Sequence, residues 1–314
     1  MKMKTMQIPK ILILFSFFTV FSCKDITIDS TQSKTVYTSP LGKEYFANEP
    51  SQKAKDEYEK ARLVFEKDSN SVENTIWLGR RTAYIGNYND AILIFTKAIE
   101  RFPDDARIYR HRGHRYISIR EFDKAIVDLE KAADLIRSKS DEIEPDGMPN
   151  AMNIPISTLH TNIYYHLGLA YYLKLDFEKA YEAYLKCYNA GTNDDNIVSS
   201  VHWLYMIQKR LGHNDLATEA LSSISDTLKI IENHEYYKIC KFYKGMLPID
   251  SLSNWKNETP ASDALKYGLA NWYFYNEQKE KSKEIILNIL NGNSWTSFGY
   301  IAAEVDYLKY ISVK

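Results

Sequence analysis

The chain has 314 residues, of which 45% are hydrophobic and 26% charged, and its formal net charge is −1. These values are ordinary for a globular protein, and the near-neutral charge argues against the basic surface that is typical of a nucleic-acid-binding protein. Only 12 glycines and 9 prolines, against 24 tyrosines, favour helices over the turn-dense sequence of an all-β protein. We therefore expect an all-α fold.

The first 22 residues have the composition of a signal peptide. Lys2, Lys4 and Lys10 supply positive charge, and the apolar run ILILFSFFTVF at 11–21 is too short for a membrane-spanning helix of about 20 residues. The run leads into the letters VFSC, ending at Cys23, which resemble the lipobox of bacterial lipoproteins. This resemblance implies cleavage before Cys23 and lipidation of its thiol and new amino group with chains such as palmitate. The alternative is a plain secretory signal with a chance cysteine.

The residues after Cys23 bear on location. Lys24 rather than Asp follows the cysteine, so the inner-membrane retention signal known from enterobacterial lipoproteins is missing. The start Cys-Lys-Asp also looks like the export signals of surface lipoproteins in Bacteroidetes. We expect a protein of the cell envelope that is lipid-anchored in the outer membrane, on its periplasmic or surface face. Residues 23–49 are rich in Ser, Thr and Asp without helical periodicity, which predicts a flexible tether.

Residues 50–314 contain an internal repeat. Small residues recur 34 positions apart at Gly79 and Gly113 and again at Ala91 and Ala125, and a third copy around Gly168 follows an insertion. Small side chains at these positions let two helices approach closely. The pattern resembles the tetratricopeptide repeat (TPR) family, in which each repeat is a pair of antiparallel helices.

The resemblance implies an all-α, right-handed superhelical solenoid of antiparallel helix pairs. We expect capping helices over 51–67 and 297–311, and five repeats, of which the last two are less regular. The repeats are placed at about 72–105, 106–137, 161–194, 198–231 and 263–296. The insertion 138–157 contains three prolines and an Asp-Gly turn, which exclude a continuous helix. It is either an idle surface excursion or a lid over the concave groove.

In TPR proteins the first helix of each repeat lines the concave face and holds the ligand. Arg110 and His114 share one helix face by their i, i+4 spacing. Arginine binds carboxylates or phosphates bidentately, and aromatic side chains suit peptides or sugar rings. The alternative is that the run YRHRGHRY is only the solvated and core-facing surface of one helix. Carried over position by position, the resemblance implies a binding site made of Trp77, Arg80, Tyr84, Arg110, His111, His114, Asn162, Tyr165, His166, His202 and Trp203.

Catalytic motifs such as G-x-S-x-G, H-E-x-x-H and a glycine-rich phosphate loop are absent from the sequence. An enzyme would need Glu144 or Asp146 to work with His111 or His166 as an acid–base pair across the groove. A metal site on His111 and His114 lacks a carboxylate or cysteine at a diagnostic spacing. We therefore expect no catalytic residue, no metal and no cofactor.

The leading functional hypothesis is a membrane-anchored, non-catalytic scaffold that binds a protein or peptide partner with an acidic or carboxylate-bearing end in its groove. The alternative is a surface lipoprotein that binds a glycan or small ligand, and an enzyme using the groove is the third reading. An envelope location argues further against a nucleic-acid partner. Cys187 and Cys240 are expected to be buried thiols, with a disulfide as the alternative.

Overall fold

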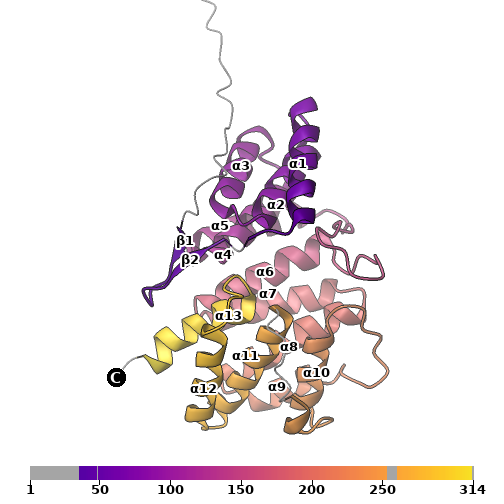
Figure 1. Ribbon diagram of the computed structural model, residues 1–314. Helices are drawn as coiled ribbons and strands as arrows, with labels where there is room; N and C mark the ends of the chain where they lie inside the picture. Colours follow the sequence, from indigo (N-terminus) through magenta and orange to yellow (C-terminus); the bar gives the residue numbers. More distant parts are fainter. Residues whose placement is uncertain (1–34, 48, 253–259, 313–314) are drawn as a thin grey trace, which may run out of the picture. The chain divides into compact units, whose positions relative to one another are not determined.

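The structure is a computed structural model that describes residues 35–47, 49–252 and 260–312. The signal peptide, Cys23 and the first part of the expected tether lie outside the described residues. The described part belongs to the unit Ser33–Lys314, and its helices are arranged as shown in Figure 1.

The described residues form thirteen α-helices, ten of which are arranged as five packed antiparallel pairs, and this confirms the all-α, TPR-like solenoid class. After the single helix α1, the pairs are α2 with α3, α4 with α5, α6 with α7, α8 with α9, and α11 with α12. The bounds are α1 Gln52–Lys67, α2 Val72–Tyr84, α3 Tyr88–Arg101, α4 Ala106–Ser118, α5 Phe122–Ile136, α6 Leu159–Leu173, α7 Phe177–Ala190, α8 Asp194–Arg210, α9 Asn214–Ala220, α10 His234–Tyr243, α11 Pro260–Tyr275, α12 Lys279–Leu290 and α13 Phe298–Asp306.

The repeated glycines bring the two helices of a pair together. A Cβ added at Gly79 would lie 2.5 Å from the ring of Phe95, and one at Gly168 would lie 2.6 Å from the ring of Tyr184. Real Cβ atoms essentially never come this close to another heavy atom, so the large side chain of the second helix fills the space that the glycine leaves. The regular spacing of the glycines, which predicted the helix pairs, is therefore explained by the need of each pair to fit a large side chain of the second helix against the first.

Each first helix ends in a turn through the left-handed backbone region. This conformation reverses the chain within three residues, and glycine adopts it without a steric cost. The residues with positive φ at these turns are Gly86, Arg120, Leu175, Gly212 and Glu277. Three of the five are not glycine, so the turn geometry is imposed there by the packing of the helices on either side.

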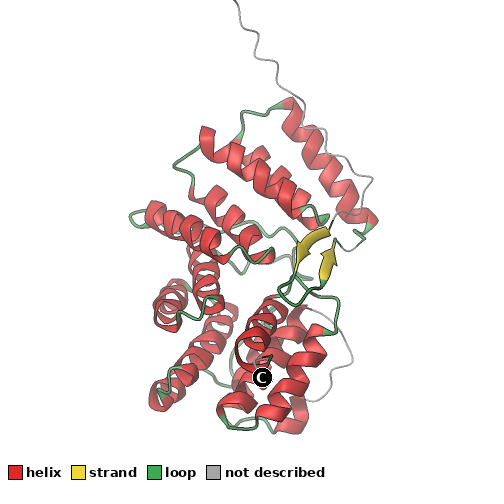
Figure 2. Ribbon diagram, turned by 90° about the vertical axis from the view of Figure 1, so that its left-hand side faces the viewer, coloured by secondary structure: helices red, strands yellow, loops and turns green. Residues whose placement is uncertain are grey.

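A β-hairpin precedes the helices, where the sequence had predicted flexible tether. Strands β1 (Thr35–Thr38) and β2 (Glu44–Phe46) pair antiparallel, and Tyr45 of β2 is buried. Its ring stacks on Trp295 at 5.3 Å between centroids, and its hydroxyl lies 2.8 Å from that of Tyr300. Residues 35–46 are thus part of the folded unit, as Figure 2 shows by the yellow strands beside the helices. The tether prediction is wrong for this stretch because aromatic partners from the other end of the chain cover Tyr45.

Helix α13 folds back against the first helices of the second and third pairs. Phe298, at its start, packs against His114 of α4 and His166 of α6, with ring centroids 5.5 and 5.6 Å apart. Glu304 accepts a hydrogen bond from Arg120 Nε at 2.8 Å. The inner face of these pairs is therefore partly filled by the chain's own C-terminal helix, which narrows the groove that the sequence had predicted to be open.

Helix α10 lies in a stretch for which the sequence had predicted no helix, and it packs on α8 and α11. A short 3₁₀ helix, η1 (Ile249–Leu252), follows it, and a π-helical turn, η2 (Tyr307–Ile311), ends the described chain. Within the described residues, every helix is too short or too polar to cross a membrane.

Candidate functional site

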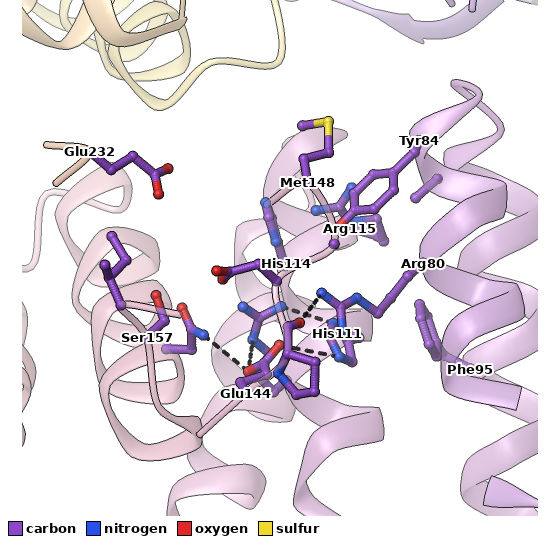
Figure 3. Close-up of a pocket in the computed structure, with 17 residues that line it drawn as sticks. Arg80, Tyr84, Phe95, His111, His114, Arg115, Glu144, Met148, Ser157 and Glu232 are labelled. Carbon is purple, nitrogen blue, oxygen red and sulfur yellow. Dashed lines mark hydrogen bonds and ion pairs between the residues drawn. The ribbon is translucent and has the colours of Figure 1, made fainter. Parts of the chain in front are cut away.

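A continuous hollow lies between the first helices of the repeats, the insertion 138–157 and α13. It consists of two adjoining cavities of about 210 and 320 Å³. The smaller, here called the insertion cavity, is lined mainly from α2, α4 and the insertion, with Phe95 of α3, Asn162 of α6 and Glu232 completing the wall (Figure 3). The larger, here called the Phe298 cavity, is lined from the insertion, α4, α6, α7, α8, α10 and Phe298 of α13. The residues that line both cavities, and so join them, are Arg110, His114, Ile156, Ser157, Asn162 and Glu232.

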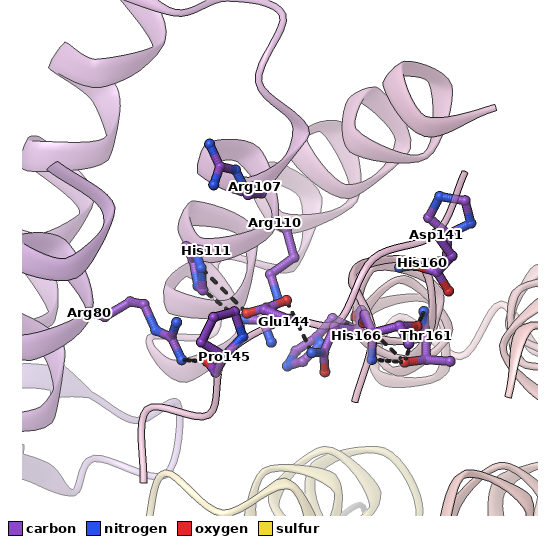
Figure 4. Close-up of polar contacts among 12 residues, drawn as sticks. Arg80, Arg107, Arg110, His111, Asp141, Glu144, Pro145, His160, Thr161 and His166 are labelled. Carbon is purple, nitrogen blue, oxygen red and sulfur yellow. Dashed lines mark hydrogen bonds and ion pairs between the residues drawn. The ribbon is translucent and has the colours of Figure 1, made fainter. Parts of the chain in front are cut away.

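The insertion forms one wall of the hollow through the carboxylate of Glu144, which is only 6% exposed. One oxygen lies 3.2 Å from Arg110 Nε and accepts a hydrogen bond from Asn162 Nδ2 at 3.1 Å, and the other lies 3.5 Å from His111 Nε2. Figure 4 shows these contacts converging on Glu144. Three residues that the sequence placed in a binding site therefore hold a carboxylate of the same chain.

The backbone of the insertion is fastened as well. Arg80 donates a hydrogen bond to the carbonyl of Pro145 at 2.7 Å, and Arg81 donates one to the carbonyl of Gly147 at 2.8 Å. A Cβ at Gly147 would lie 1.9 Å from the hydroxyl oxygen of Tyr84, so any larger residue here would force the Tyr84 ring to move. The insertion is thus a fixed part of the cavity wall and no idle surface excursion.

Three neutral histidines line the hollow. Burial is the main cause that lowers the pKa of His111, His114 and His166 well below the ordinary value, and nearby arginine charges lower it further. His166 Nδ1 lies 2.6 Å from the carbonyl of Asn162, which requires the proton on Nδ1 and leaves Nε2 as an acceptor. Among the described residues this Nε2 has no hydrogen-bond partner. The histidines therefore offer the hollow polar atoms without positive charge at neutral pH.

Positive charge in the insertion cavity comes from Arg80, Arg110 and Arg115. Arg80 and Arg110 are held by the insertion, as described above. Arg115 is 9% exposed, and within the described part of the chain its contact is with the ring of Tyr88, 5.6 Å from the guanidinium carbon. Burial lowers its pKa, and Arg110 and Arg80 lower it further. The acidic side chains on the cavity wall are Glu144, Asp146 and Glu232.

The structure brings most of the predicted site residues to the hollow. The insertion cavity is lined by Arg80, Tyr84, Arg110, His111, His114 and Asn162, and the Phe298 cavity is lined by Arg110, His114, Asn162, Tyr165 and His166. Trp77 lines neither cavity. Its indole donates a hydrogen bond to Glu73 at 2.7 Å, and the guanidinium of Arg80 stacks over its ring at 4.3 Å.

The predicted binding roles of His202 and Trp203 are corrected, because both are core residues with 0% exposure and neither lines either of the two cavities described here. Trp203 stacks on Tyr184 at 5.6 Å between centroids and donates its indole hydrogen to the Tyr165 hydroxyl at 2.9 Å. His202 lies against Tyr243 of α10, with ring centroids 6.0 Å apart. The unexpected helix α10 covers the face of α8 that the repeat pattern had assigned to the open groove.

Sequence reasoning missed several residues of the hollow. Arg115 lies outside the positions that the TPR resemblance assigns to a ligand, although its charge was visible. Nothing in the sequence pointed to Glu232. It reaches the cavity because the buried carboxylate of Asp195 accepts hydrogen bonds from the backbone N–H groups of residues 231–233 and so fixes the chain there. Phe298 belongs to a helix that was expected to serve only as a cap.

The acid–base pair that an enzyme would need is partly present, since Glu144 and His111 lie 3.5 Å apart. One oxygen of the same carboxylate, however, is already held by Arg110 at 3.2 Å and by a hydrogen bond from Asn162 at 3.1 Å. In the residues that the structure describes, no group of three or more His, Cys, Asp or Glu side chains is arranged to hold a metal ion. The geometry favours binding of a polar group over proton transfer.

No protein-family model matches the chain, and none of the curated proteins matches it. Among solved structures, MamA is 22% identical over 60% of this chain and 86% of its own, with a TM-score of 0.41. YrrB, described as a TPR protein with an unusual peptide-binding site, is 15% identical over 78% of this chain and 96% of its own, with a TM-score of 0.44. These similarities are distant and assign no function. The fold assignment rests on the helix pairs themselves, which make this chain a TPR-like helical-repeat protein.

Proposed function

We propose that this protein is a non-catalytic scaffold that binds a polypeptide segment of a partner in the hollow between α2, α4, α6 and the insertion. The observation that carries the proposal is the pair of hydrogen bonds from Arg80 to the carbonyl of Pro145 and from Arg81 to the carbonyl of Gly147. Side chains on the inner face of the repeats already hold a length of main chain. A second segment laid along the same face would meet donors and acceptors of the same kind.

The shape of the hollow supports the same reading. Its two cavities share six lining residues, so a bound segment can run from the insertion across α4 and α6 to Phe298. Polar side chains spaced along this path offer hydrogen bonds to a backbone, while Tyr84 and Phe298 offer apolar contacts to side chains. Repeat scaffolds use such inner faces for unrelated partners, so the fold leaves the partner open.

A matched pair of surface substitutions tests the proposal. Met148 is 75% exposed on the rim of the insertion cavity, whereas Val127 is 66% exposed on α5, which contributes nothing to the hollow. Peptides selected from a random display library against the wild-type protein should lose affinity for Met148→Lys and keep it for Val127→Lys. Equal binding to both variants, or no selectable peptide, would refute a peptide site in the hollow.

A second candidate function is capture of a glycan or small ligand. It is favoured by the volume of the Phe298 cavity, about 320 Å³, which lies within the range of small-molecule sites. A glycan array and a metabolite panel would separate the two functions. Saturable binding of an oligosaccharide, lost in Phe298→Ala and accompanied by a failed peptide selection, would replace the first proposal with this one.

We further propose that Cys23 is lipidated and holds the protein at the outer membrane. Support comes from the charged start, the short apolar run and the VFSC letters of the sequence. Metabolic labelling with a palmitate analogue should mark the wild-type protein and leave Cys23→Ser unlabelled. Fractionation should place the labelled protein with outer membranes, and protease treatment of intact cells should tell the surface face from the periplasmic face. Label retained in Cys23→Ser would contradict the proposal.

A further inference from the structure

In the described part of the chain, the positively charged side chain of Arg115 has no acidic side chain as a partner. Its side chain is buried on α4, at 9% exposure, and lines the insertion cavity. Across the described residues it takes part in no hydrogen bond and no ion pair, and its contact is the aromatic face of Tyr88. By contrast, Arg112 on the same helix is paired with Asp128 through two hydrogen bonds of 2.7 Å. Arg115 is therefore unlike Arg112, a half-buried arginine of the same helix that has a carboxylate partner.

Such a residue is costly for the folded state. A guanidinium stays protonated in proteins, so burial cannot be relieved by losing the charge. The nearby cations Arg110 and Arg80 carry the same sign and lower its pKa further, while Tyr88 and Tyr84 act in the opposite direction. A buried cation surrounded in this way gains most from an anion that enters the cavity.

We infer that Arg115 is the binding residue of an anion subsite in the insertion cavity, and that its ligand is an organic carboxylate joined to an apolar or aromatic group. The inference rests on the proposed function and names the chemistry that the hollow recognises. The cavity already gives one example, since Arg110 and Asn162 hold the carboxylate of Glu144 within it. Arg115 offers the same fork-shaped group, which donates two hydrogen bonds to one carboxylate, to a ligand that the chain does not supply.

The other lining residues select among anions. Asp146 and Glu232 also face the cavity, so a doubly charged phosphate is repelled more than a singly charged carboxylate. Ala83, Tyr84 and Phe95 contribute apolar wall beside Arg115, which suits a hydrocarbon or ring next to the carboxylate. The same carboxylate chemistry occurs in free organic acids and at the C-terminus of a peptide.

Calorimetric titration of the full protein separates these sources with three probes: phenylacetate, N-acetylphenylalanine and N-acetylphenylalanine amide. We expect both acids to bind at least about tenfold more tightly than the amide, which corresponds to about 1.4 kcal/mol. If N-acetylphenylalanine binds and phenylacetate does not, the subsite takes the C-terminal end of a polypeptide. If the two acids bind equally well, the subsite takes free organic acids. Competition by chloride or inorganic phosphate at the same concentrations as the acids would overturn the carboxylate assignment.

Variants test the residue. Arg115→Gln should lose the acids by at least about tenfold while its melting temperature stays equal or rises, because an uncompensated buried charge is removed. Arg107→Gln, on the same helix but outside the cavity, should bind as the wild type does. Unchanged acid binding in Arg115→Gln would refute the subsite. If library peptides bind Arg115→Gln as well as they bind the wild type, the subsite is refuted and the proposed peptide-binding function stands. If the acids bind but no peptide does, the subsite stands and the proposed function is refuted.

Discussion

Arg120 donates a hydrogen bond to Glu304 at 2.8 Å across 184 positions of sequence, and both side chains are almost completely buried. The pair joins the turn after α4 to the C-terminal helix α13. The same carboxylate group accepts hydrogen bonds from Ser39 and Tyr45 of the hairpin region. Residues from the beginning, middle and end of the described chain therefore meet at one carboxylate.

Glu304→Gln should destabilise the protein by about 3 kcal/mol or more, because it leaves the buried guanidinium of Arg120 without its counter-charge. Chemical denaturation measures the change. Arg137→Ala is the control, since its pair with Asp134 is exposed and should contribute less than about 0.5 kcal/mol. An equal loss in both variants would show that the buried pair adds nothing beyond a surface charge.

Glu144→Ala should loosen the insertion. The substitution removes the ion-pair partner of Arg110 and the hydrogen-bond acceptor of Asn162, so amide hydrogen exchange at residues 143–148 should become faster while exchange in α4 and α6 stays slow. Glu142→Ala, with an exposed side chain two positions earlier, is the matched control and should leave exchange unchanged. Wild-type exchange rates in Glu144→Ala would mean that the backbone contacts alone hold the insertion.

Gly168→Ala should destabilise the protein, although alanine is about 1 kcal/mol more favourable than glycine within a helix. The new methyl group would sit 2.6 Å from the Tyr184 ring and force the two helices apart, at a typical cost of about 1–3 kcal/mol. Thermal unfolding measures the balance. Lys186→Ala, exposed on the same second helix, should change stability by less than about 0.5 kcal/mol. A stabilised Gly168→Ala would show that propensity outweighs packing here.

These glycines explain why the helix pairs could be predicted from the sequence. Gly79, Gly113 and Gly168 each pack against a large side chain sixteen residues later within their own pair, so the signal is local and repeats with the fold. Six of the predicted site residues reach the insertion cavity for the same reason, because position along a first helix determines the direction of its side chain.

The features that could not be predicted depend on contacts between distant segments. Tyr45 is buried only because Trp295 and Tyr300 cover it, and nothing in the short sequence TVYTSPLGKEYF announces those partners. His202 was assigned to an open groove because the repeat pattern carries no information about α10. A pattern with the period of one repeat cannot report which later segment will cover its inner face.

The stability of the protein should fall in mild acid. Burial lowers the pKa of His202 to about 3, whereas an unfolded histidine titrates near 6.5. The unfolded state therefore takes up the proton first, and stability that is fully present above about pH 6.5 is lost at about 1.4 kcal/mol per pH unit below it. His111, His114 and His166 act in the same direction.

A substitution isolates the contribution of His202, whose two ring nitrogens have no hydrogen-bond partner among the described residues. His202→Leu should gain on the wild type by about 2 kcal/mol between pH 7 and pH 5, as measured by denaturation at each pH. Val127→Leu, at an exposed and non-titrating position on α5, serves as the control, and its pH dependence should match that of the wild type. A parallel pH dependence in wild type and His202→Leu would remove His202 as the cause.

Cys187 and Cys240 are free and buried, as the sequence had predicted, and burial raises the pKa of the Cys187 thiol to about 12. Cys187 lies in the third helix pair, and Cys240 lies in α10, next to the fourth. Because the two thiols are only 2% and 0% exposed, we expect neither to react readily with a bulky alkylating reagent until its own surroundings open. The labelling rates of the two cysteines therefore report on local opening at two places in the array. Equal rates would indicate that the array opens in one concerted event, and faster labelling of Cys240 would indicate fraying from the C-terminal end.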